Sequence, residues 1–299
     1  MSTTSAKLAS MASARGHARS QNIDGSEVKY WFYPAKTSTP KTIIFIHGYR
    51  GNHRGLEAIA GALDDFDIYI PDLPGFGASE AMHSEHSIKN YSSWLAQFIA
   101  GLSLSAKPVL LGHSFGTIVC SHFATKNSKL ISRLILVNPV SAPALKGPKA
   151  LLTSVATAFF WLAARLPKKT ADWLLKSWPM VRGMSIVMTK TKDKNLRAWV
   201  HRQHDENFND FAELRVAIEG YRASVSNCVA DFASKIEVPT LMIAGSKDDI
   251  TTVQQQQAAF SKISAPRSAL EVISNVGHLT HYETPGQIAT LVRDFSRGA

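Results

Sequence analysis

The chain has 299 residues, of which 45% are hydrophobic and 19% charged, a globular balance that argues against disordered and fibrous classes. Its net charge is +10, but no stripe of Arg and Lys with interleaved aromatics suggests a nucleic-acid module, so a membrane surface or an acidic partner is favoured over DNA. Only two cysteines occur, Cys120 and Cys228, which argues against a disulfide framework or a zinc cluster and favours a reducing, cytoplasmic compartment.

The first 23 residues are rich in Ser and Ala and contain Lys and Arg but no acidic residue. They lack the continuous apolar stretch of a secretory signal, although their composition overlaps that of an organelle transit peptide. We therefore expect residues 1–23 to form a flexible N-terminal segment, with a targeting segment as the alternative.

From Lys41 onwards, short apolar runs alternate with longer amphipathic ones, the pattern of strand and helix units that feed a parallel sheet. The runs show little alternation, as expected when helices cover both faces of the sheet. The sequence predicts an α/β fold with a mostly parallel, doubly wound sheet. Strands are predicted over 42–48, 67–72, 108–114, 134–139, 240–246 and 270–274, an antiparallel edge strand over 27–33, and helices over 54–63, from 87, after 114, over 253–263 and over 285–297.

Strand signals stop between Val140 and about Val225, where the chain becomes helical, apolar and basic. This stretch is too long for an ordinary connection. We interpret residues 141–225 as a helical cap, inserted between the two parts of the core, 24–140 and 226–299. The cap is expected over the carboxyl edge of the sheet, where ligands bind in open α/β folds, with the substrate pocket beneath it.

A candidate nucleophile lies in the segment Gly112-His113-Ser114-Phe115-Gly116, which follows a predicted strand and opens a predicted helix. In this strand–turn–helix context, G-x-S-x-G holds its serine in a strained conformation at the sheet edge, and its glycines let neighbouring segments approach. The alternative is a plain turn in which Ser114 caps the helix.

A serine hydroxyl needs a base, and His278 follows the last predicted strand in a loop before the final helix. His281 is its local rival; His278 is preferred because Gly277 gives its loop freedom. The imidazole in turn needs an acid, and the end of the preceding strand offers Asp248, with Asp249 as the fallback. The other place for an acid, after the strand over 134–139, is occupied by Asn138.

Backbone N–H groups aimed at the carbonyl oxygen would stabilise the charge that develops there during attack. We assign this oxyanion hole to the N–H of Phe115, which follows the nucleophile, and the N–H of Tyr49 in the loop after the first core strand. The side chain of Tyr49 is also expected to wall the pocket.

Five motifs, in this order and at these strand ends, resemble those of the α/β-hydrolase fold family over residues 41–299. HGYRG (47–51) is similar to its oxyanion loop, PDLPGFGAS (71–79) to the next loop, GHSFG (112–116) to its nucleophile elbow, GSKDD (245–249) to its acid turn and GHLTHYETP (277–285) to its histidine loop. The resemblance implies a Ser-His-Asp hydrolase that needs no metal or organic cofactor and works through an acyl-enzyme intermediate. Serine at 114 departs from the family's aspartate-nucleophile members, and HGYRG departs from the HGGPG loop of proline iminopeptidases.

The predicted cap contains a nearly uncharged helix, Ala150 to Ala164, flanked by basic residues. At about 1.5 Å per residue it would reach only about 22 Å, too short to span a bilayer, so it either lies on a membrane surface or covers the pocket, which is favoured. Phe159 and Trp161 of this helix are predicted to bind substrate. So is Met184, from a row at 180, 184 and 188 that could equally be core.

His201 and His204 have a spacing compatible with a metal pair, but the sequence offers no evident third ligand, so no metal is assigned and solvated side chains are expected. The predicted activity is hydrolysis of a small hydrophobic carboxylic ester, with possible peripheral contact to an anionic membrane. The alternatives are a carbon–carbon bond hydrolase of ring-cleavage products and a ligand or membrane-surface binding protein with slow turnover.

Overall fold

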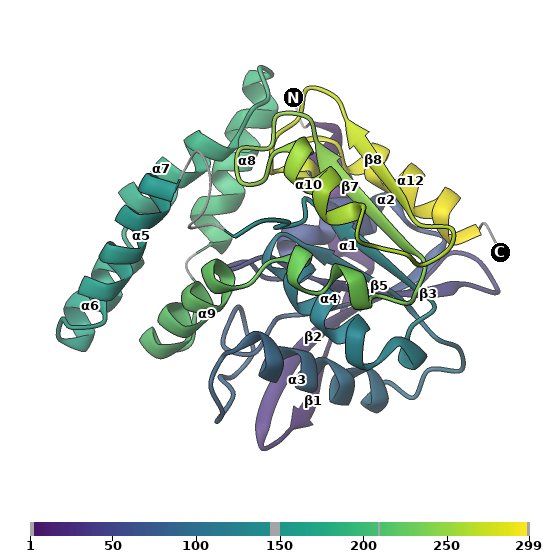
Figure 1. Cartoon of the computed structure of the whole chain (residues 1–299), viewed down its shortest axis with the longest axis horizontal. Coiled ribbons are helices and arrows are strands. Elements are labelled where there is room, and N and C mark those ends of the chain that lie inside the picture. Colours follow the sequence, from purple (N-terminus) through teal and green to yellow (C-terminus); the bar gives the residue numbers. More distant parts are fainter. Residues whose placement is uncertain (1–2, 144–149, 209, 298–299) are drawn as a thin grey trace.

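An eight-stranded sheet forms the centre of the computed structural model, which describes residues 3–143, 150–208 and 210–297 (Figure 1). The strands are β1 (His17–Ile23), β2 (Ser26–Tyr33), β3 (Lys41–Ile46), β4 (Phe66–Pro71), β5 (Val109–His113), β6 (Arg133–Val137), β7 (Thr240–Gly245) and β8 (Ala269–Ile273). Their order is β1-β2-β4-β3-β5-β6-β7-β8, parallel from β4 to β8, with β2 antiparallel to both neighbours. The predicted α/β fold with a mostly parallel sheet is confirmed.

Helices cover both faces of the sheet. They are α1 (Thr4–Arg15), α2 (Glu57–Ala62), α3 (Ile88–Gly101), α4 (Phe115–Lys126), α5 (Ala150–Ala163), α6 (Lys168–Leu175), α7 (Trp178–Met188), α8 (Lys194–Asn207), α9 (Leu214–Ser226), α10 (Val253–Phe260), α11 (Thr280–Glu283) and α12 (Pro285–Arg297). Short 3-10 turns are η1 (His53–Leu56), η2 (Ser128–Leu130), η3 (Val229–Asp231) and η4 (Ala233–Lys235).

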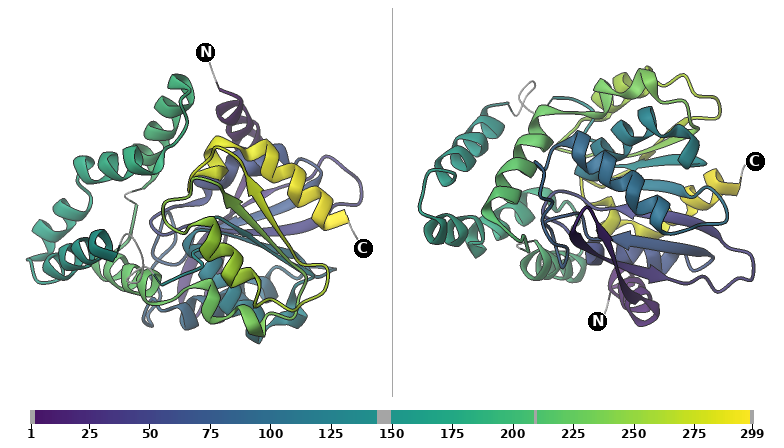
Figure 2. Two further views of the ribbon diagram at one scale, coloured as in Figure 1. Left: turned by 45° about the horizontal axis from the view of Figure 1, so that its top comes forward. Right: turned by 90° about the horizontal axis from the view of Figure 1, so that it is seen from below.

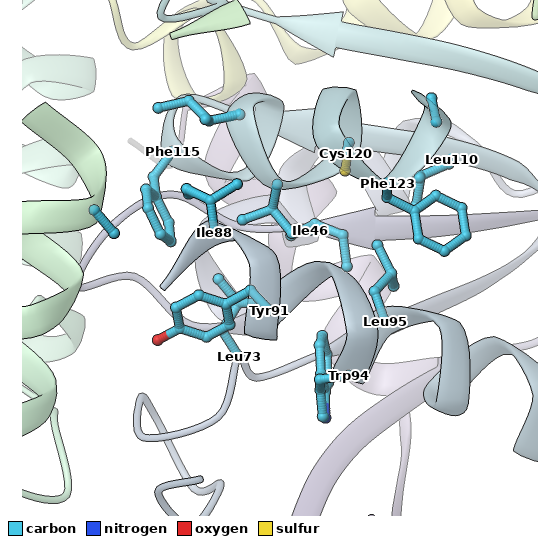
Figure 3. Close-up of a cluster of buried hydrophobic side chains, with 14 of the residues drawn as sticks. Ile46, Leu73, Ile88, Tyr91, Trp94, Leu95, Leu110, Phe115, Cys120 and Phe123 are labelled. Carbon is cyan, nitrogen blue, oxygen red and sulfur yellow. The ribbon is translucent and has the colours of Figure 1, made fainter. Parts of the chain in front are cut away.

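Successive residues of β3 point into two different hydrophobic clusters. Ile43 and Phe45 pack with residues of α1, α2 and α12 on one face. Ile44 and Ile46 pack with residues of α3 and α4 on the other face, and Figure 3 draws this second cluster. Because both faces are buried there, the strand is apolar from Ile43 to Ile46 and shows no alternation.

The N-terminal segment is the part of the fold that the sequence predicted wrongly. Residues 4–23 form α1 and β1, and β1 takes the edge position expected for 27–33. The helix docks through backbone contact, because a Cβ on Gly61 of α2 would lie only 1.9 Å from the carbonyl oxygen of Leu8. Arg15 then fixes the end of α1 by donating to the carbonyl oxygens of Pro34 at 2.6 Å and Ala60 at 2.5 Å. The small Ser and Ala side chains of α1 allow this close packing. They do not form an apolar pattern in the sequence, which is why the helix was not predicted.

Between β6 and β7 the chain leaves the sheet and forms α5 to α9, which we call the helical insertion (residues 141–225 of the prediction). Its helices lie on one side of the sheet, and α5, α6 and α7 form the part farthest from it (Figures 1 and 2). The two ends of the insertion lie side by side, since Val229 N–H donates to the carbonyl oxygen of Val140 at 2.8 Å. Within the described residues, every helix is too short or too polar to cross a membrane.

Candidate active site

Ser114 lies in a tight turn between β5 and α4, as the sequence predicted. Its backbone has φ 51° and ψ −118°, a conformation that is strained for any residue other than glycine. Two glycines make the turn possible: a Cβ on Gly112 would lie 2.5 Å from the carbonyl oxygen of Gly116, and a Cβ on Gly116 would lie 2.3 Å from that of Ile46. The turn therefore holds the Ser114 hydroxyl at the carboxyl edge of the sheet.

The three residues predicted to act together form a continuous chain of hydrogen bonds. Ser114 Oγ is 2.8 Å from His278 Nε2, and His278 Nδ1 is 2.9 Å from Asp248 Oδ2. Both His278 and Asp248 are buried. In this arrangement His278 can accept the hydroxyl proton while Asp248 accepts the Nδ1–H and fixes the tautomer.

The local rivals have other contacts. Asp249 forms an ion pair with Lys190 of the segment after α7. His281 is buried, and its ring centroid lies 3.9 Å from that of His113. Gly277 has a different role from the one inferred for it, because a Cβ there would lie 2.6 Å from Lys190 Cγ. Close approach of the 190 segment to the histidine loop, rather than loop freedom, is what this glycine permits.

Asn138, at the end of β6, supports Asp248 and was not assigned a role from the sequence. Its Nδ2 donates to Asp248 Oδ2 at 2.9 Å and to the carbonyl oxygen of Gly277 at 3.1 Å, while its Oδ1 accepts from the Thr280 hydroxyl. Asn138 is fully buried with φ 47°, a left-handed conformation that asparagine tolerates better than most residues. Only the fold of the chain brings these segments together, so no local sequence pattern indicates the contact.

The environment of Asp248 favours its ionised form. Burial alone raises the pKa of this carboxyl, but His278 and the donors around it outweigh burial, so the pKa lies below its usual value. Among these donors are Asn138 Nδ2 and the backbone N–H of Ile250, which lies 2.8 Å from Asp248 Oδ1. Behind His278, burial together with the charge of His278 lowers the pKa of His113 to about 3, which keeps His113 neutral.

The loop after β3 passes directly against the nucleophile. A Cβ on Gly48 would lie 3.3 Å from Ser114 Cβ. His47 shapes this loop, because its Nε2 accepts the N–H of Leu73 at 2.8 Å and its Nδ1–H donates to the carbonyl oxygen of Gly48 at 2.8 Å. The backbone of Tyr49, predicted to supply one oxyanion donor, therefore follows a segment whose position is fixed by the two hydrogen bonds of the His47 ring.

Arg50 ties the same loop to the helical insertion. It has φ 61° and is almost completely buried. Its Nη2 donates to the carbonyl oxygen of Leu175 at the end of α6 at 2.7 Å, and its Nε donates to that of Phe208 after α8 at 3.1 Å. The position of the loop thus depends on how the insertion is packed.

A cavity of about 390 Å³ opens at Ser114 and is lined both by the strand ends and by the helical insertion. Its walls are mainly apolar and aromatic. Apolar and aromatic lining residues that the sequence did not single out include Leu56, Val140, Phe208, Tyr221, Val225, Leu279 and Tyr282. Single apolar residues carry no signal of their own in the sequence, which is why this wall was missed.

Of the three predicted substrate-binding residues, Met184 lines the cavity and the other two do not. Trp161 is 58% exposed, and Phe159 packs against the hydrophobic core. Their neighbour Phe160 is buried and stacks on Tyr221, which lines the cavity, with ring centroids 4.0 Å apart. The helix is apolar on all sides, so its sequence has no period to fix which side faces inward.

His201 and His204 meet at one serine rather than in solvent. The Nδ1 atoms of His201 and His204 lie 2.6 Å and 2.7 Å from Ser185 Oγ, and His204 is buried, which corrects the expectation of two solvated side chains. The described part of the chain has no cluster of three or more His, Cys, Asp or Glu residues placed to hold a metal ion. The pair therefore joins α7 to α8.

Comparison with known proteins places these features in context. A family model described as alpha/beta hydrolase fold matches residues 41–285. Lipase 3 of a Moraxella species is 24% identical over 271 residues, 87% of this chain and 78% of the relative. Putative esterase/lipase 3 of Mycoplasma genitalium is 36% identical over 120 residues, 40% of this chain and 44% of the relative, so the chain spans less than half of that protein.

Solved structures agree on the fold. The enol-lactonase from Burkholderia xenovorans has a TM-score of 0.76 at 18% identity and covers 93% of this chain and 99% of its own. A thermophilic esterase from Thermogutta terrifontis has a TM-score of 0.72 at 20% identity, covering 94% and 98%. At these identities the likeness concerns the fold alone.

Proposed function

The chain belongs to the alpha/beta hydrolase fold family, and on this premise we propose that it is a serine hydrolase that cleaves hydrophobic carboxylic esters. The observation that carries the proposal is the chain of hydrogen bonds from Ser114 through His278 to Asp248, which opens into a mainly apolar cavity. The esterase and lipase names of the relatives support the same class of reaction.

The proposed reaction has two halves. In the first, Ser114 Oγ attacks the ester carbonyl carbon and His278 Nε2 accepts its proton, while the N–H groups of Tyr49 and Phe115 hold the developing oxyanion. His278 then protonates the leaving alcohol, which leaves an acyl group on Ser114. In the second half, His278 accepts a proton from water as the water oxygen attacks the acyl carbon. His278 then returns this proton to Ser114 Oγ as the bond between Oγ and the acyl carbon breaks, which releases the carboxylic acid and restores the hydroxyl.

The cavity supports an apolar substrate. Met184 and Met188, one turn apart on α7, line it together with the aromatic residues Phe115 and Tyr221. Methionine side chains adapt their shape, which suits flexible acyl chains. Peripheral contact with an anionic membrane is part of the proposal.

The test compares three single-residue variants, of which Asp249→Asn is the matched control for Asp248→Asn. Ser114→Ala and Asp248→Asn are expected to lower ester turnover by about 10³-fold or more without unfolding the protein, whereas Asp249→Asn is expected to stay within a few-fold of the parent. The substrates are a panel of p-nitrophenyl esters of increasing chain length, and a fluorophosphonate probe should label the parent but not Ser114→Ala. Unchanged turnover in Ser114→Ala would refute the proposal. So would a parent enzyme that cleaves a vinylogous diketone but no ester.

A further inference from the structure

Large apolar side chains are exposed on three helices of the insertion. Among the described residues, seven of the eleven large hydrophobic side chains that are exposed lie on α5, α6 and α7. Three of the seven are tryptophans: Trp161 is 58% exposed, Trp173 72% and Trp178 59%. The other four are Leu162, Met184, Ile186 and Val187. Exposed tryptophans gathered in one part of a chain mark an interaction surface.

These helices already bury a different side against the protein. Ala171 and Leu175 of α6 and Val181 of α7 are buried, whereas Trp173 and Ile186 on the same helices are exposed. The three helices also form the part of the molecule farthest from the sheet, with open space outside them (Figures 1 and 2). The seven exposed side chains are thus additional to the packed ones, and we call the surface that they form on these three helices the α5–α7 face.

Positive charge is concentrated in the same stretch. Residues 145–192 contain nine Lys and Arg but a single acid, Asp172, so this stretch supplies most of the chain's net charge of +10. Two of the basic residues lie over exposed tryptophans: Arg165 Cζ is 3.3 Å from the ring centroid of Trp161, and Arg182 Cζ is 5.4 Å from that of Trp178. Tryptophan together with basic residues is typical of helices that lie in a membrane interface.

We propose that the α5–α7 face docks on an anionic lipid bilayer, and that the enzyme takes its ester substrates from that bilayer. The charge argues for a membrane rather than a second copy of the chain, because two such faces brought together would repel each other. Anionic headgroups would instead attract the Lys and Arg side chains of this stretch.

The same face adjoins the candidate active site. Met184 lines the cavity and is also 36% exposed, and Met188, one turn further along α7, lines the cavity as well. One helix thus contributes both to the docking face and to the wall of the pocket. This part of the inference rests on the proposed function, because it assigns the substrate class: esters with long acyl chains that reside in lipid.

The first experiment measures binding to vesicles of phosphatidylcholine alone and of phosphatidylcholine mixed with phosphatidylglycerol. The parent should bind the mixed vesicles at least tenfold more tightly, and added salt should weaken this binding. Trp173→Ser/Trp178→Ser should reduce it at least tenfold, and Lys168→Glu/Lys169→Glu at least fivefold. The matched control, Leu130→Ser/Val272→Ser, removes two exposed apolar side chains elsewhere and should bind like the parent.

The second experiment separates docking from catalysis. All variants should cleave a soluble short-chain ester at the parental rate, which also reports that they are folded, whereas the tryptophan and lysine variants should lose activity on a long-chain ester held in mixed vesicles. Equal vesicle binding by parent and tryptophan variant would overturn the inference. The inference would also be overturned if the parent were a dimer that does not bind vesicles and the tryptophan variant were a monomer. A parent that binds vesicles but cleaves no ester would refute the proposed function and leave the docking face supported.

Discussion

Replacing Asn138 by alanine tests whether a residue that never touches the substrate sets the geometry of the candidate triad. The amide donates to Asp248 Oδ2 and to the Gly277 carbonyl oxygen and accepts from Thr280. A hydrogen bond to a buried carboxylate is worth about 1.5–3 kcal/mol and a neutral one about 1 kcal/mol. Asn138→Ala should therefore lower the free energy of unfolding by about 3–5 kcal/mol.

Only the bond to Asp248 bears directly on the reaction. If its whole strength is expressed in the transition state, kcat/KM falls by about 10- to 150-fold, because about 1.4 kcal/mol corresponds to a factor of ten. The loss should be smaller than that of Asp248→Asn, since the backbone N–H groups of Ile250 and Thr251 still hold the carboxylate. Asp248 keeps its orientation in part, so we expect an intermediate effect.

The variant should also change the pH dependence of stability. The pKa of Asp248 lies below its usual value in the folded chain, so its ionised form contributes stability that is lost only as the pH falls below about 4. Removing the Asn138 donor raises this pKa towards its unfolded value, so the acid-dependent loss of stability should be smaller and should be complete at a higher pH. Denaturant titrations from pH 3 to 7 and ester kinetics measure both effects, with Asn90→Ala as a control that removes an amide donor remote from the triad. Parental kinetics and stability in Asn138→Ala would refute the reasoning.

Three further predictions concern the packing around the site. Burial and the charges of His201 and Arg182 lower the pKa of His204 to about 4, whereas a histidine of the unfolded chain has a pKa of about 6.5. Acidification from pH 7 to pH 5 should therefore lower the free energy of unfolding by about 2 kcal/mol through this residue. Denaturation of His204→Leu should show a smaller loss over this pH range, and an equal loss would contradict the prediction. Gly116→Ala should abolish most ester turnover, since the new Cβ meets a backbone oxygen at 2.3 Å. Gly277→Ala should keep most of it, because its Cβ crowds the side chain of Lys190 at 2.6 Å while the nearest backbone oxygens lie at 3.4 Å. Equal kinetics in the two variants would count against the geometry. Arg50→Met should lower the free energy of unfolding by about 2–4 kcal/mol and raise KM, because the carbonyl oxygens of Leu175 and Phe208 lose their donor. Denaturation and ester kinetics measure the two effects. An unchanged Tm would contradict the prediction.

The parts of the fold and site that sequence patterns predicted are those that local chemistry determines. Each core strand is a short apolar run, and Ser114, Asp248 and His278 each follow such a run. Because the strands are parallel, their carboxyl ends meet at one edge of the sheet, and residues more than 160 positions apart come within hydrogen-bond distance. Chain order alone was sufficient to place these three residues near one another.

Other features depend on contacts that no local pattern records. β1 is largely exposed and polar, so it has no hydrophobic signal, and it exists because β2 offers it a pairing edge. Asn138 was noted only as the absence of an acid, and its role as a donor to Asp248 appears once β6 and β7 lie side by side. The sequence prediction chose Phe159 and Trp161 rather than Phe160, because a helix that is apolar on all sides has no hydrophobic period to show which residues face inward.

The hydrogen bond between Val229 and Val140 closes the base of the helical insertion, so the chain departs from the sheet and re-enters it at one point. Val140 N–H is held as well, by the hydroxyl of Thr117 on α4 at 3.2 Å. The length and sequence of an insertion anchored in this way can change while the strand ends that carry Ser114, Asp248 and His278 keep their positions. Evolution, or a protein engineer, could exchange residues 141–228 for a different set of helices and so retarget the same chemistry to another substrate.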